Sequence, residues 1–306
     1  MKEHNKTLLT ILGPTATGKT KLAAQVAAQI NGEIISADSR QVYKGMDLGT
    51  GKDYEDYRVG DSIIKYHLVD IVEAGTVYNL FRFQQDCLKA IEDIVSRNKF
   101  PVLCGGTGMY IEAVLENYHL SYTPINTGLR DKLKDFTDKQ LKELLSSLRE
   151  LHNTTDDDRE RLIRAIEIEQ YKLDNSNTKN NDSLLLNNVL VGIHFERDVI
   201  GTRITSRLKT RLNTGMIEEV KALLDNGLTP EQLKFYGLEY RYITMYLTNE
   251  ITYDKMFELL NIAIHQFAKR QMTWFRRMEK KGYQIHWIDG NLEDTVKVNT
   301  ILVLLN

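Results

Sequence analysis

The chain has 306 residues, of which 42% are hydrophobic and 27% are charged. This composition is typical of a soluble globular protein and excludes a disordered chain, a collagen or a disulfide-stapled scaffold. The net charge is −2, from 40 Lys and Arg against 42 Asp and Glu, so a uniformly basic nucleic-acid binder is excluded although a local basic face is not. The two cysteines, Cys87 and Cys104, are too few for a disulfide framework or a structural zinc site and indicate a reducing cytosol.

The hydropathy of the chain predicts where the protein resides. Residues 1–10 lack the basic start and the long apolar stretch of a secretion signal. The longest apolar runs, such as residues 301–305, are far shorter than the roughly 20 residues that a membrane-spanning helix needs. We therefore expect a cytoplasmic protein that does not enter a membrane.

Short apolar runs alternate with helical patterns in the first third of the chain. Strands are predicted at residues 7–12, 33–36, 66–71 and 101–104, and helices at residues 20–30 and 80–98. Such alternation predicts right-handed βαβ units, in which parallel strands form a central sheet flanked by helices. The fold class is therefore α/β.

The pattern changes in the middle of the chain. Residues 129–173 are charged and helical without a strand pattern, and the polar, Asn-rich residues 174–183 predict a loop. Further on, strands are predicted at residues 188–195 and 284–288, and a long helix at residues 253–281. The simplest organisation is an α/β core of residues 1–118 and 188–306, interrupted by an all-helical insertion domain of residues 119–187.

Residues 13–20 read GPTATGKT and fit the phosphate-loop pattern G-x-x-x-x-G-K-[ST]. The motif lies between a predicted strand and a predicted helix, which is the context that it requires. Its glycines let backbone N–H groups turn toward phosphate oxygens, and the helix N-terminus adds partial positive charge. Lys19 supplies a cation, and Thr20 supplies a hydroxyl for Mg²⁺. The alternative is a chance match in a turn rich in Gly and Thr.

A phosphate-loop nucleotide hydrolase needs a second acid at a strand end. The strand at residues 101–104 lacks one, and Asp70, in the strand predicted at residues 66–71, is only a weak match. The strand at residues 101–104 continues instead into Gly105, Gly106 and Thr107, a second candidate contact for an anion or a hydroxyl. The strand at residues 33–36 leads to Asp38, at the edge of the sheet where ligands bind. A carboxylate there can accept a proton from a nucleophile. The alternative is an aspartate that caps a helix or forms a turn.

Basic residues gather in three predicted helices. Residues 269–281 hold six cations, one anion and Trp274, and residues 203–211 hold four cations and no acid. Basic helices with aromatic rings can pair with phosphates and stack on unpaired bases. Arg161 and Arg164 share one helical face of the insertion. In each case the alternative is a solvated helix face, with any aromatic rings turned to the core.

Five stretches together resemble the tRNA dimethylallyltransferase family, which transfers an isopentenyl group to an adenosine beside the anticodon. They are GPTATGKT, ISADSRQVYKGMDLGTGK, VLCGGTGMYIEAVL, RERLIRAIEI and KRQMTWFRR, at residues 13–20, 35–52, 102–115, 159–168 and 269–277. Their order and spacing extend the resemblance over nearly the whole chain. The chain differs from the usual family pattern at Gly51, at Asp53, and within residues 156–158 and 236–241. It has no zinc finger of the eukaryotic type, which implies a bacterial form.

The resemblance implies three roles for the site residues. Asp38 would be the general base on adenine N6, and Thr107 would help to position the site as a second catalytic residue. The donor would be dimethylallyl diphosphate. Its diphosphate would be bound by Gly13, Pro14, Thr15, Ala16, Thr17, Gly18, Lys19, Thr20 and Arg203. Mg²⁺ would accompany the diphosphate and would contact Thr20. The anticodon stem-loop of tRNA would contact Asp38, Ser39, Arg40, Gln41, Thr107, Arg130, Glu160, Arg161, Leu162, Ile163, Arg164, Lys269, Arg270, Gln271, Met272, Thr273 and Trp274.

These roles suit the chemistry of prenyl transfer. Adenine N6 is a weak nucleophile because its lone pair is delocalised, so a base that removes its proton assists C–N bond formation. Diphosphate leaves readily once Lys19, backbone donors and Mg²⁺ carry its charge. The target adenosine, at position 37 of the tRNA, would be flipped out of its stack to reach the donor. A water-positioning acid is then unnecessary.

Two other functions share part of these features. A P-loop small-molecule or nucleoside kinase would use the phosphate loop and Asp38, but it leaves the missing second acid and the basic aromatic helix unexplained. A non-catalytic tRNA-binding module would not depend on Asp38 for its biological role. For each of these functions we expect a monomer.

Overall fold

The computed structural model describes residues 7–116, 123–151, 158–175 and 187–305. The chain divides into two compact units. The core unit comprises Met1–Tyr118 and Leu184–Asn306, and the helical unit comprises His119–Ser183. Each unit has a hydrophobic core of its own.

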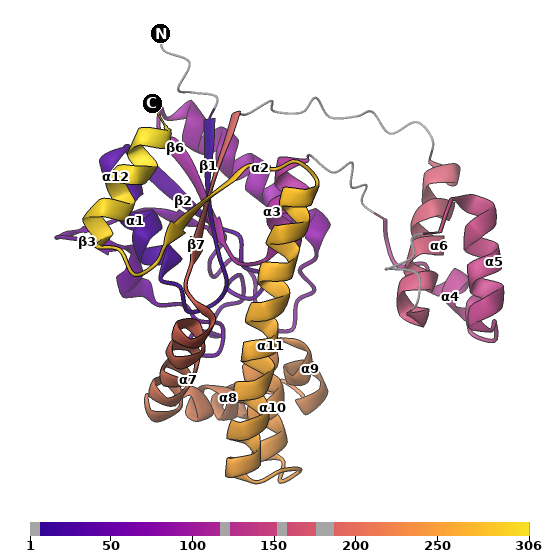
Figure 1. Ribbon diagram of the computed structural model, residues 1–306. Coiled ribbons are helices and arrows are strands. Elements are labelled where there is room, and N and C mark those ends of the chain that lie inside the picture. The colour runs from indigo at the N-terminus through magenta and orange to yellow at the C-terminus, as the bar shows by residue number, and fades with distance from the viewer. Residues whose placement is uncertain (1–6, 117–122, 152–157, 176–186, 306) are drawn as a thin grey trace. The chain divides into compact units, whose positions relative to one another are not determined.

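A six-stranded sheet lies at the centre of the core unit (Figure 1). Its strands, in spatial order, are β5 (Tyr66–His67), β2 (Gly32–Ser36), β6 (Phe100–Gly105), β1 (Thr7–Leu12), β7 (Asn187–His194) and β8 (Ile285–Asp289). Every neighbouring pair is parallel, and Leu9 of β1 lies between Val102 of β6 and Val189 of β7. The predicted α/β class with a parallel sheet is confirmed.

Side chains along each strand alternate between two cores, one on each face of the sheet. In β1, Leu8 and Leu12 belong to the larger core, which also contains side chains of α2 (Leu80–Ser96), α3 (Gly108–Leu115) and α11 (Tyr253–Lys280). Leu9 and Ile11 belong to the smaller core, which α1 (Lys19–Gln29) and α12 (Asp294–Leu304) cover. Parallel sheets are normally buried on both faces in this way. The loops after β1, β2 and β6 consequently meet at one edge of the sheet.

A layer of helices lies past the carboxyl ends of the strands (Figure 1). It consists of α7 (Arg197–Asn213), α8 (Met216–Asp225), α9 (Pro230–Phe235), α10 (Leu238–Leu247) and the first half of α11. Along the 28 residues of α11, most buried side chains recur every three or four positions from Met256 to Met278. This spacing gives one apolar stripe that faces the core. The stripe packs α11 along both the helical layer and the sheet.

The helical unit consists of three helices in its described part, α4 (Thr127–Leu133), α5 (Asp138–Leu148) and α6 (Arg159–Asp174). Its core is made by Leu133, Leu141, Leu145, Leu162, Ile163 and Ile166. Thr137 and Gln140 form a capping box at the start of α5, and Asp158 caps α6. Such caps satisfy N–H groups that a helix leaves open at its first turn.

The structure corrects three details of the predicted elements. The strand predicted at residues 66–71 ends at His67, because Leu68 and Asp70 adopt positive φ angles of 62° and 55°. The β3–β4 hairpin (Arg58–Val59 and Ser62–Ile63) and α12 were not predicted. Most of the loop predicted at residues 174–183 lies outside the described residues. Within the described ranges, no helix is both long enough and apolar enough to cross a membrane.

Candidate active site

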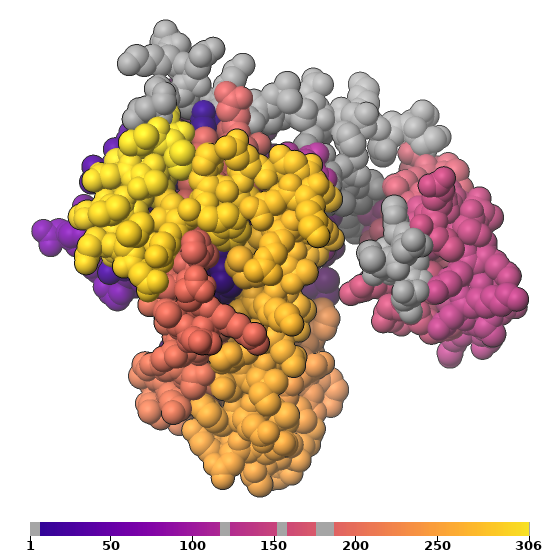
Figure 2. All heavy atoms as spheres, viewed as in Figure 1, coloured from indigo at the N-terminus to yellow at the C-terminus, as the bar shows by residue number. Residues whose placement is uncertain are grey.

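A cavity of about 540 Å³ lies at the carboxyl edge of the sheet in the core unit. Its walls come from the loops after β1, β2 and β6, from α7, from the turn between α9 and α10, and from α11. In Figure 2, a small indigo surface from the N-terminal part of the chain is visible between α7 and α11. A cavity of this size with converging polar groups is typical of a small-molecule site.

Most of the predicted site residues of the core unit line this cavity. Those in the lining are Thr15, Ala16, Thr17, Gly18, Lys19, Thr20, Asp38, Ser39, Arg40, Gln41, Thr107, Arg203, Arg270 and Gln271. Six others, Gly13, Pro14, Lys269, Met272, Thr273 and Trp274, are outside the lining. The fold therefore brings together residues that are up to about 250 positions apart, as expected when all strands end at one edge.

The phosphate loop connects β1 to α1 and lines the cavity. Gly18 is the N-cap of α1 at a φ of 76° and supplies no side-chain cap, so the helix N-terminus keeps open N–H groups and partial positive charge for an anion. Lys19 Nζ and Thr17 Oγ1 both donate to the Pro14 carbonyl, at 3.1 and 2.9 Å. Burial lowers the pKa of Lys19, an effect that the nearby Asp38 opposes.

Gln271 of α11 joins the phosphate loop to the loop after β6. The buried side chain accepts a hydrogen bond from the Thr15 N–H through Oε1 at 2.9 Å and donates to the Gly106 carbonyl through Nε2 at 2.8 Å. A Cβ atom at position 106 would lie 2.3 Å from Nε2, so glycine is needed there. The amide of Gln271, predicted to contact tRNA, therefore binds the protein itself at both ends.

Asp38 follows β2 and lines the cavity beside Thr107. Its Oδ1 accepts a hydrogen bond from the Arg40 N–H at 2.8 Å, which is the turn geometry considered as the alternative for this residue. Its Oδ2 has no hydrogen-bond partner in the described part of the chain. The Thr107 hydroxyl accepts a hydrogen bond from the Ser39 N–H at 3.3 Å and so connects the loops after β2 and β6. The turn leaves one carboxylate oxygen of Asp38 available to a ligand.

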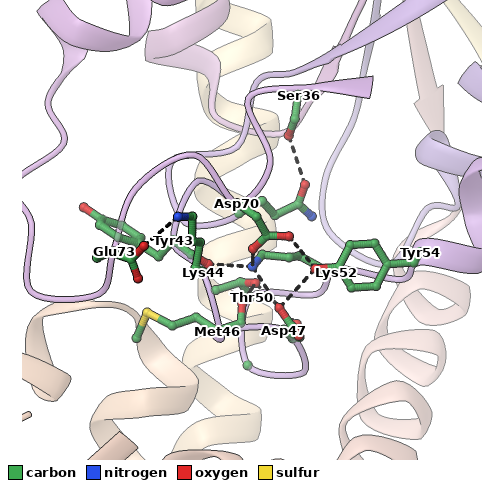
Figure 3. Close-up of polar contacts among 12 residues, drawn as sticks. Ser36, Tyr43, Lys44, Met46, Asp47, Thr50, Lys52, Tyr54, Asp70 and Glu73 are labelled. Carbon is green, nitrogen blue, oxygen red and sulfur yellow. Dashed lines mark hydrogen bonds and ion pairs between the residues drawn. The ribbon is translucent and has the colours of Figure 1, made fainter. Parts of the chain in front are cut away.

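Lys52 is at the centre of a polar cluster that shapes the segment after β2 (Figure 3). Its side chain is 1% exposed, and Nζ donates to the Tyr43 carbonyl at 2.6 Å, to Asp47 at 2.9 Å and to Asp70. Tyr54 donates its hydroxyl to the same two carboxylates, and burial together with Asp70 raises the pKa of this phenol. Each of the three N–H donors of the buried ammonium thus has a partner, either a carboxylate or a carbonyl oxygen, as a buried charge requires.

Glu219 of α8 binds the backbone of the turn at residues 47–49, which begins at Asp47 of this cluster. Its carboxylate accepts hydrogen bonds from the N–H groups of Asp47, Leu48 and Gly49 at 2.7 to 3.0 Å and from the Tyr240 hydroxyl at 2.6 Å. Three backbone donors on one carboxylate fix the turn and bring the next residues to the cavity wall.

Three arginines of α7 line the same cavity at a spacing of four residues, which places them on one helix face. Arg203 Nε donates to the Ala16 carbonyl of the phosphate loop at 2.8 Å. Arg207 and Arg211 both donate to Asp53, at 2.7 and 2.9 Å. Asp53 was not predicted as a site residue. The sequence offered two signals, the four-residue spacing of the arginines and the departure from the family pattern at Asp53, but it did not connect them because Asp53 lies more than 150 positions before Arg207 and Arg211.

Two exposed phenylalanines stand in the cavity wall next to arginines. Phe235 is 69% exposed, and the Arg40 guanidinium lies 5.6 Å from its ring centroid. Phe267 is 38% exposed, and the Arg270 guanidinium lies 6.0 Å from its ring centroid. Aromatic rings and guanidinium planes are surfaces on which unpaired bases stack. Sequence reasoning missed both rings because a single phenylalanine carries no local signal.

The remaining residues predicted on α11 differ in exposure. Lys269 and Thr273 are exposed, whereas Met272 and Trp274 are half-buried against the larger core. The Arg277 guanidinium lies 3.9 Å from the centroid of a Trp274 ring. The exposed side chains in the last part of α11, from Lys269 to Lys280, are therefore mainly cationic, and its tryptophan is half-buried against the core.

In the helical unit, two of the predicted arginines bind the buried carboxylate of Glu167. Arg130 donates to both oxygens at 2.8 and 2.9 Å, and Arg164 donates to one at 3.0 Å. Burial alone would raise the pKa of Glu167, but these arginines lower the pKa to about 2. Of the other predicted residues, Glu160 and Arg161 are exposed, whereas Leu162 and Ile163 belong to the core of the unit, so their side chains pack inside it.

Comparison with known proteins identifies the family. A family model described as IPP transferase matches residues 41–278, and one described as isopentenyl transferase matches residues 6–60. The tRNA dimethylallyltransferase 1 of Parabacteroides distasonis is 51% identical over 300 residues, which cover 98% of this chain and 97% of the relative. The chain belongs to the tRNA dimethylallyltransferase family. It is therefore a prenyltransferase that modifies tRNA, and the enzyme class implied by the sequence resemblance is confirmed.

Further tRNA dimethylallyltransferases and solved structures agree with this assignment. The tRNA dimethylallyltransferase 1 of Geotalea uraniireducens is 49% identical over 97% of each chain. A tRNA isopentenylpyrophosphate transferase from Bacillus halodurans superposes with a TM-score of 0.70 at 29% identity, over 98% of this chain and 97% of that one. A eukaryotic dimethylallyltransferase acting on tRNA gives 0.77 at 26% identity, over 93% and 74%. These findings support prenyl transfer to tRNA and not the kinase alternative.

Proposed function

We propose that this enzyme transfers the dimethylallyl group of dimethylallyl diphosphate to N6 of the adenosine at position 37, 3′ of the anticodon, and releases diphosphate. The proposal rests on one observation: the phosphate loop with Lys19 and the carboxylate of Asp38 line the same cavity. The loop can hold the leaving group while the carboxylate faces the incoming amine. The volume of about 540 Å³ is in the range of sites that enclose small-molecule substrates.

In the proposed reaction, the N6 lone pair forms a bond to C1 of the allyl group while the bond between C1 and the diphosphate oxygen breaks. Asp38 accepts the proton that N6 loses, acting as general base. The turn that binds Oδ1 to the Arg40 N–H fixes the carboxylate and leaves Oδ2 for this proton. Thr107 has a positioning role, because it holds the backbone of Ser39 next to the base.

The leaving diphosphate carries charge that the phosphate loop would stabilise. The open N–H groups of α1, the Lys19 ammonium and the Arg203 guanidinium are among the donors in that part of the cavity. Mg²⁺ bound to a diphosphate usually has one or two protein ligands and several waters. The Thr20 hydroxyl in the first turn of α1 fits this requirement, whereas no group of three or more His, Cys, Asp or Glu in the described residues could hold a metal alone. Bound Mg²⁺ would neutralise charge on the leaving oxygen.

The tRNA would approach the cavity along its cationic and aromatic residues. An adenosine within a stack cannot present N6 to the donor, so the base must be flipped out, at a cost of a few kcal/mol. Phe235 with Arg40 and Phe267 with Arg270 offer stacking surfaces at the cavity, and Lys269 adds a cation for the backbone. In the helical unit, Arg130, Arg161 and Arg164 offer further cations to the same RNA.

The decisive experiment mixes the purified enzyme with labelled dimethylallyl diphosphate, Mg²⁺ and tRNA from cells that lack the modification. We expect label on one anticodon-loop adenosine and release of an equal amount of diphosphate. Asp38→Asn and Lys19→Ala proteins serve as matched controls for the base and for the cradle. Label on another nucleotide, or transfer of the γ-phosphate of ATP in place of prenyl transfer, would contradict the proposal.

A further inference from the structure

Two arginines of α7 share one carboxylate in the cavity wall. Arg207 Nη2 donates to Asp53 Oδ2 at 2.7 Å, and Arg211 Nη2 donates to both oxygens of the same carboxylate at 3.0 and 2.9 Å. Because the arginines are four residues apart, their side chains lie one helical turn from each other. All three residues line the cavity. One carboxylate thus holds two guanidinium groups side by side.

This arrangement places like charges together, which is unfavourable unless something compensates. Burial and the neighbouring Arg207 lower the pKa of Arg211, whose side chain is 12% exposed. Burial alone would raise the pKa of Asp53, but Arg211 and Arg207 lower it below its usual value, so the acid stays ionised. At Gly51, a Cβ atom would lie 3.0 Å from Arg211 Nη1 and 3.2 Å from Arg207 Nη2, and φ is +79°. Glycine at this position therefore leaves the room that the two guanidinium groups occupy.

Arg207 keeps N–H donors that a ligand in the cavity can use. The side chain of Arg207 is 33% exposed, and in the described part of the chain only its Nη2 donates hydrogen bonds. Nε and Nη1 consequently keep donors for a ligand. Arg207 is also close enough to Lys19 to add to the lowering of the Lys19 pKa by burial. The acids that line the same cavity are Asp38, Asp53, Asp56 and Glu239, and burial raises the pKa of Asp56 and of Glu239.

We propose that Arg207 is a further diphosphate contact, and that Asp53 and Arg211 are positioning residues that hold its guanidinium in the cavity wall. This inference rests on the proposed function. A guanidinium whose orientation is fixed before the reaction can donate to oxygens on which charge grows as the C–O bond breaks, without reorganisation at that moment. The phosphate loop and Arg207 would then contact the diphosphate from two separate elements. Asp53 keeps Arg207 from turning toward solvent and balances one of the two charges.

The test measures the binding of inorganic diphosphate with Mg²⁺ by calorimetry, together with the steady-state kinetics of prenyl transfer. Arg207→Met should weaken diphosphate binding by about ten- to a hundredfold, which corresponds to the loss of charge-assisted hydrogen bonds. Asp53→Asn should weaken it by about tenfold and raise KM for the donor, with KM for tRNA unchanged. Asp53→Glu, which keeps the charge, should restore most of the affinity. Arg58→Met, which removes a surface cation paired with Glu55, is the charge-matched control and should bind diphosphate as the wild type does.

The outcomes separate this inference from the proposed function. If the wild type binds diphosphate, Lys19→Ala does not, and both Arg207→Met and Asp53→Asn bind it as tightly as the wild type or more tightly, Arg207 is not a contact and the inference is wrong. If Lys19→Ala retains full affinity, the phosphate-loop assignment itself fails. If Asp53→Asn unfolds, Arg207→Lys gives the answer, because it keeps the charge but loses the planar fork. We then expect reduced affinity for diphosphate at an unchanged melting temperature, and unchanged affinity would overturn the inference.

Discussion

Gln271 accepts a hydrogen bond from the backbone N–H of Thr15, 256 positions earlier in the chain, at 2.9 Å. The same side chain donates to the Gly106 carbonyl at 2.8 Å. One buried amide thus connects the phosphate loop, the loop after β6 and α11. The conformation of the phosphate loop depends in part on a residue of the basic helix that the sequence resemblance associated with tRNA.

Replacement of this amide tests the connection. In Gln271→Ala, the partly buried Thr15 N–H and the buried Gly106 carbonyl each lose a partner, so we expect the free energy of unfolding to fall by about 1–3 kcal/mol. Diphosphate binding should weaken as well, because the phosphate loop is no longer held. Urea denaturation and calorimetry measure the two effects. Thr273→Ala, on the exposed face of the same helix, is the stability control and should change the unfolding energy little; equal stability of both variants would contradict the structural role of Gln271.

Asp38 is expected to act on the chemical step and not on tRNA binding. In Asp38→Asn the turn with the Arg40 N–H can persist, because the amide oxygen still accepts, but the side chain no longer takes a proton. We expect kcat to fall by at least about a hundredfold, in line with contributions of general bases. Single-turnover kinetics and filter binding of tRNA separate the two quantities. Asp61→Asn, in the exposed turn between β3 and β4, is the control; a kcat of Asp38→Asn within a fewfold of it would refute the assigned role.

Local motifs made part of this site predictable from sequence. Lys19 and Thr20 belong to a contiguous pattern between a strand and a helix, so their placement followed from eight neighbouring residues. Asp38 followed because β2 ends at the same edge of the parallel sheet as β1, although β6 lies between the two strands. The class of fold and all six strands of the central sheet were likewise predictable, since each strand is a short apolar run with its own turn signals.

The structural roles of residues that act through distant partners escaped prediction, including that of Gln271, which was predicted only as a tRNA contact. Asp53, Glu219 and Gln271 look like ordinary polar residues in the sequence, and their roles depend on partners more than 150 positions away. Phe235 stands out only when its exposure in the cavity wall is known. The strand at Tyr66–His67 ended early because Leu68 adopts a positive φ, which nothing in its side chain announces. Tertiary contacts, and not local propensity, decide such positions.

The Lys52 cluster should contribute strongly to stability. In Lys52→Met, the Asp47 and Asp70 carboxylates keep their places without a cation, and removing one partner of a buried ion pair typically costs about 3–5 kcal/mol. Because both acids are partly exposed, we expect a loss near the lower limit. Urea denaturation of the full chain measures it. The double variant Lys52→Met/Asp70→Asn should recover part of the lost stability, because it also removes an uncompensated charge. A single variant as stable as the wild type would show that the cluster contributes nothing.

The helical unit should lose stability as the pH falls through the range in which Glu167 takes up a proton. Against the effect of burial, Arg130 and Arg164 lower the pKa of Glu167 from 4.5 to about 2. An acid whose pKa is lower in the folded state stabilises the fold above its unfolded pKa, and this contribution is lost as the pH decreases toward the folded value. We therefore expect full stabilisation above about pH 5 and a loss of about 3 kcal/mol by pH 2.

Hydrogen exchange at the amides of α6 in the full chain can measure this loss, because it reports local opening of that helix. Other carboxylates also titrate in this range, so the comparison is with Glu167→Gln, which cannot ionise. At pH 7 the variant should exchange faster than the wild type, since a neutral amide leaves the two guanidinium groups without their anion. The difference between the two proteins should shrink between pH 5 and pH 2 and vanish below it. A constant difference across this range would mean that the ionised carboxylate does not stabilise the helical unit, and that Arg130 and Arg164 are not held by it.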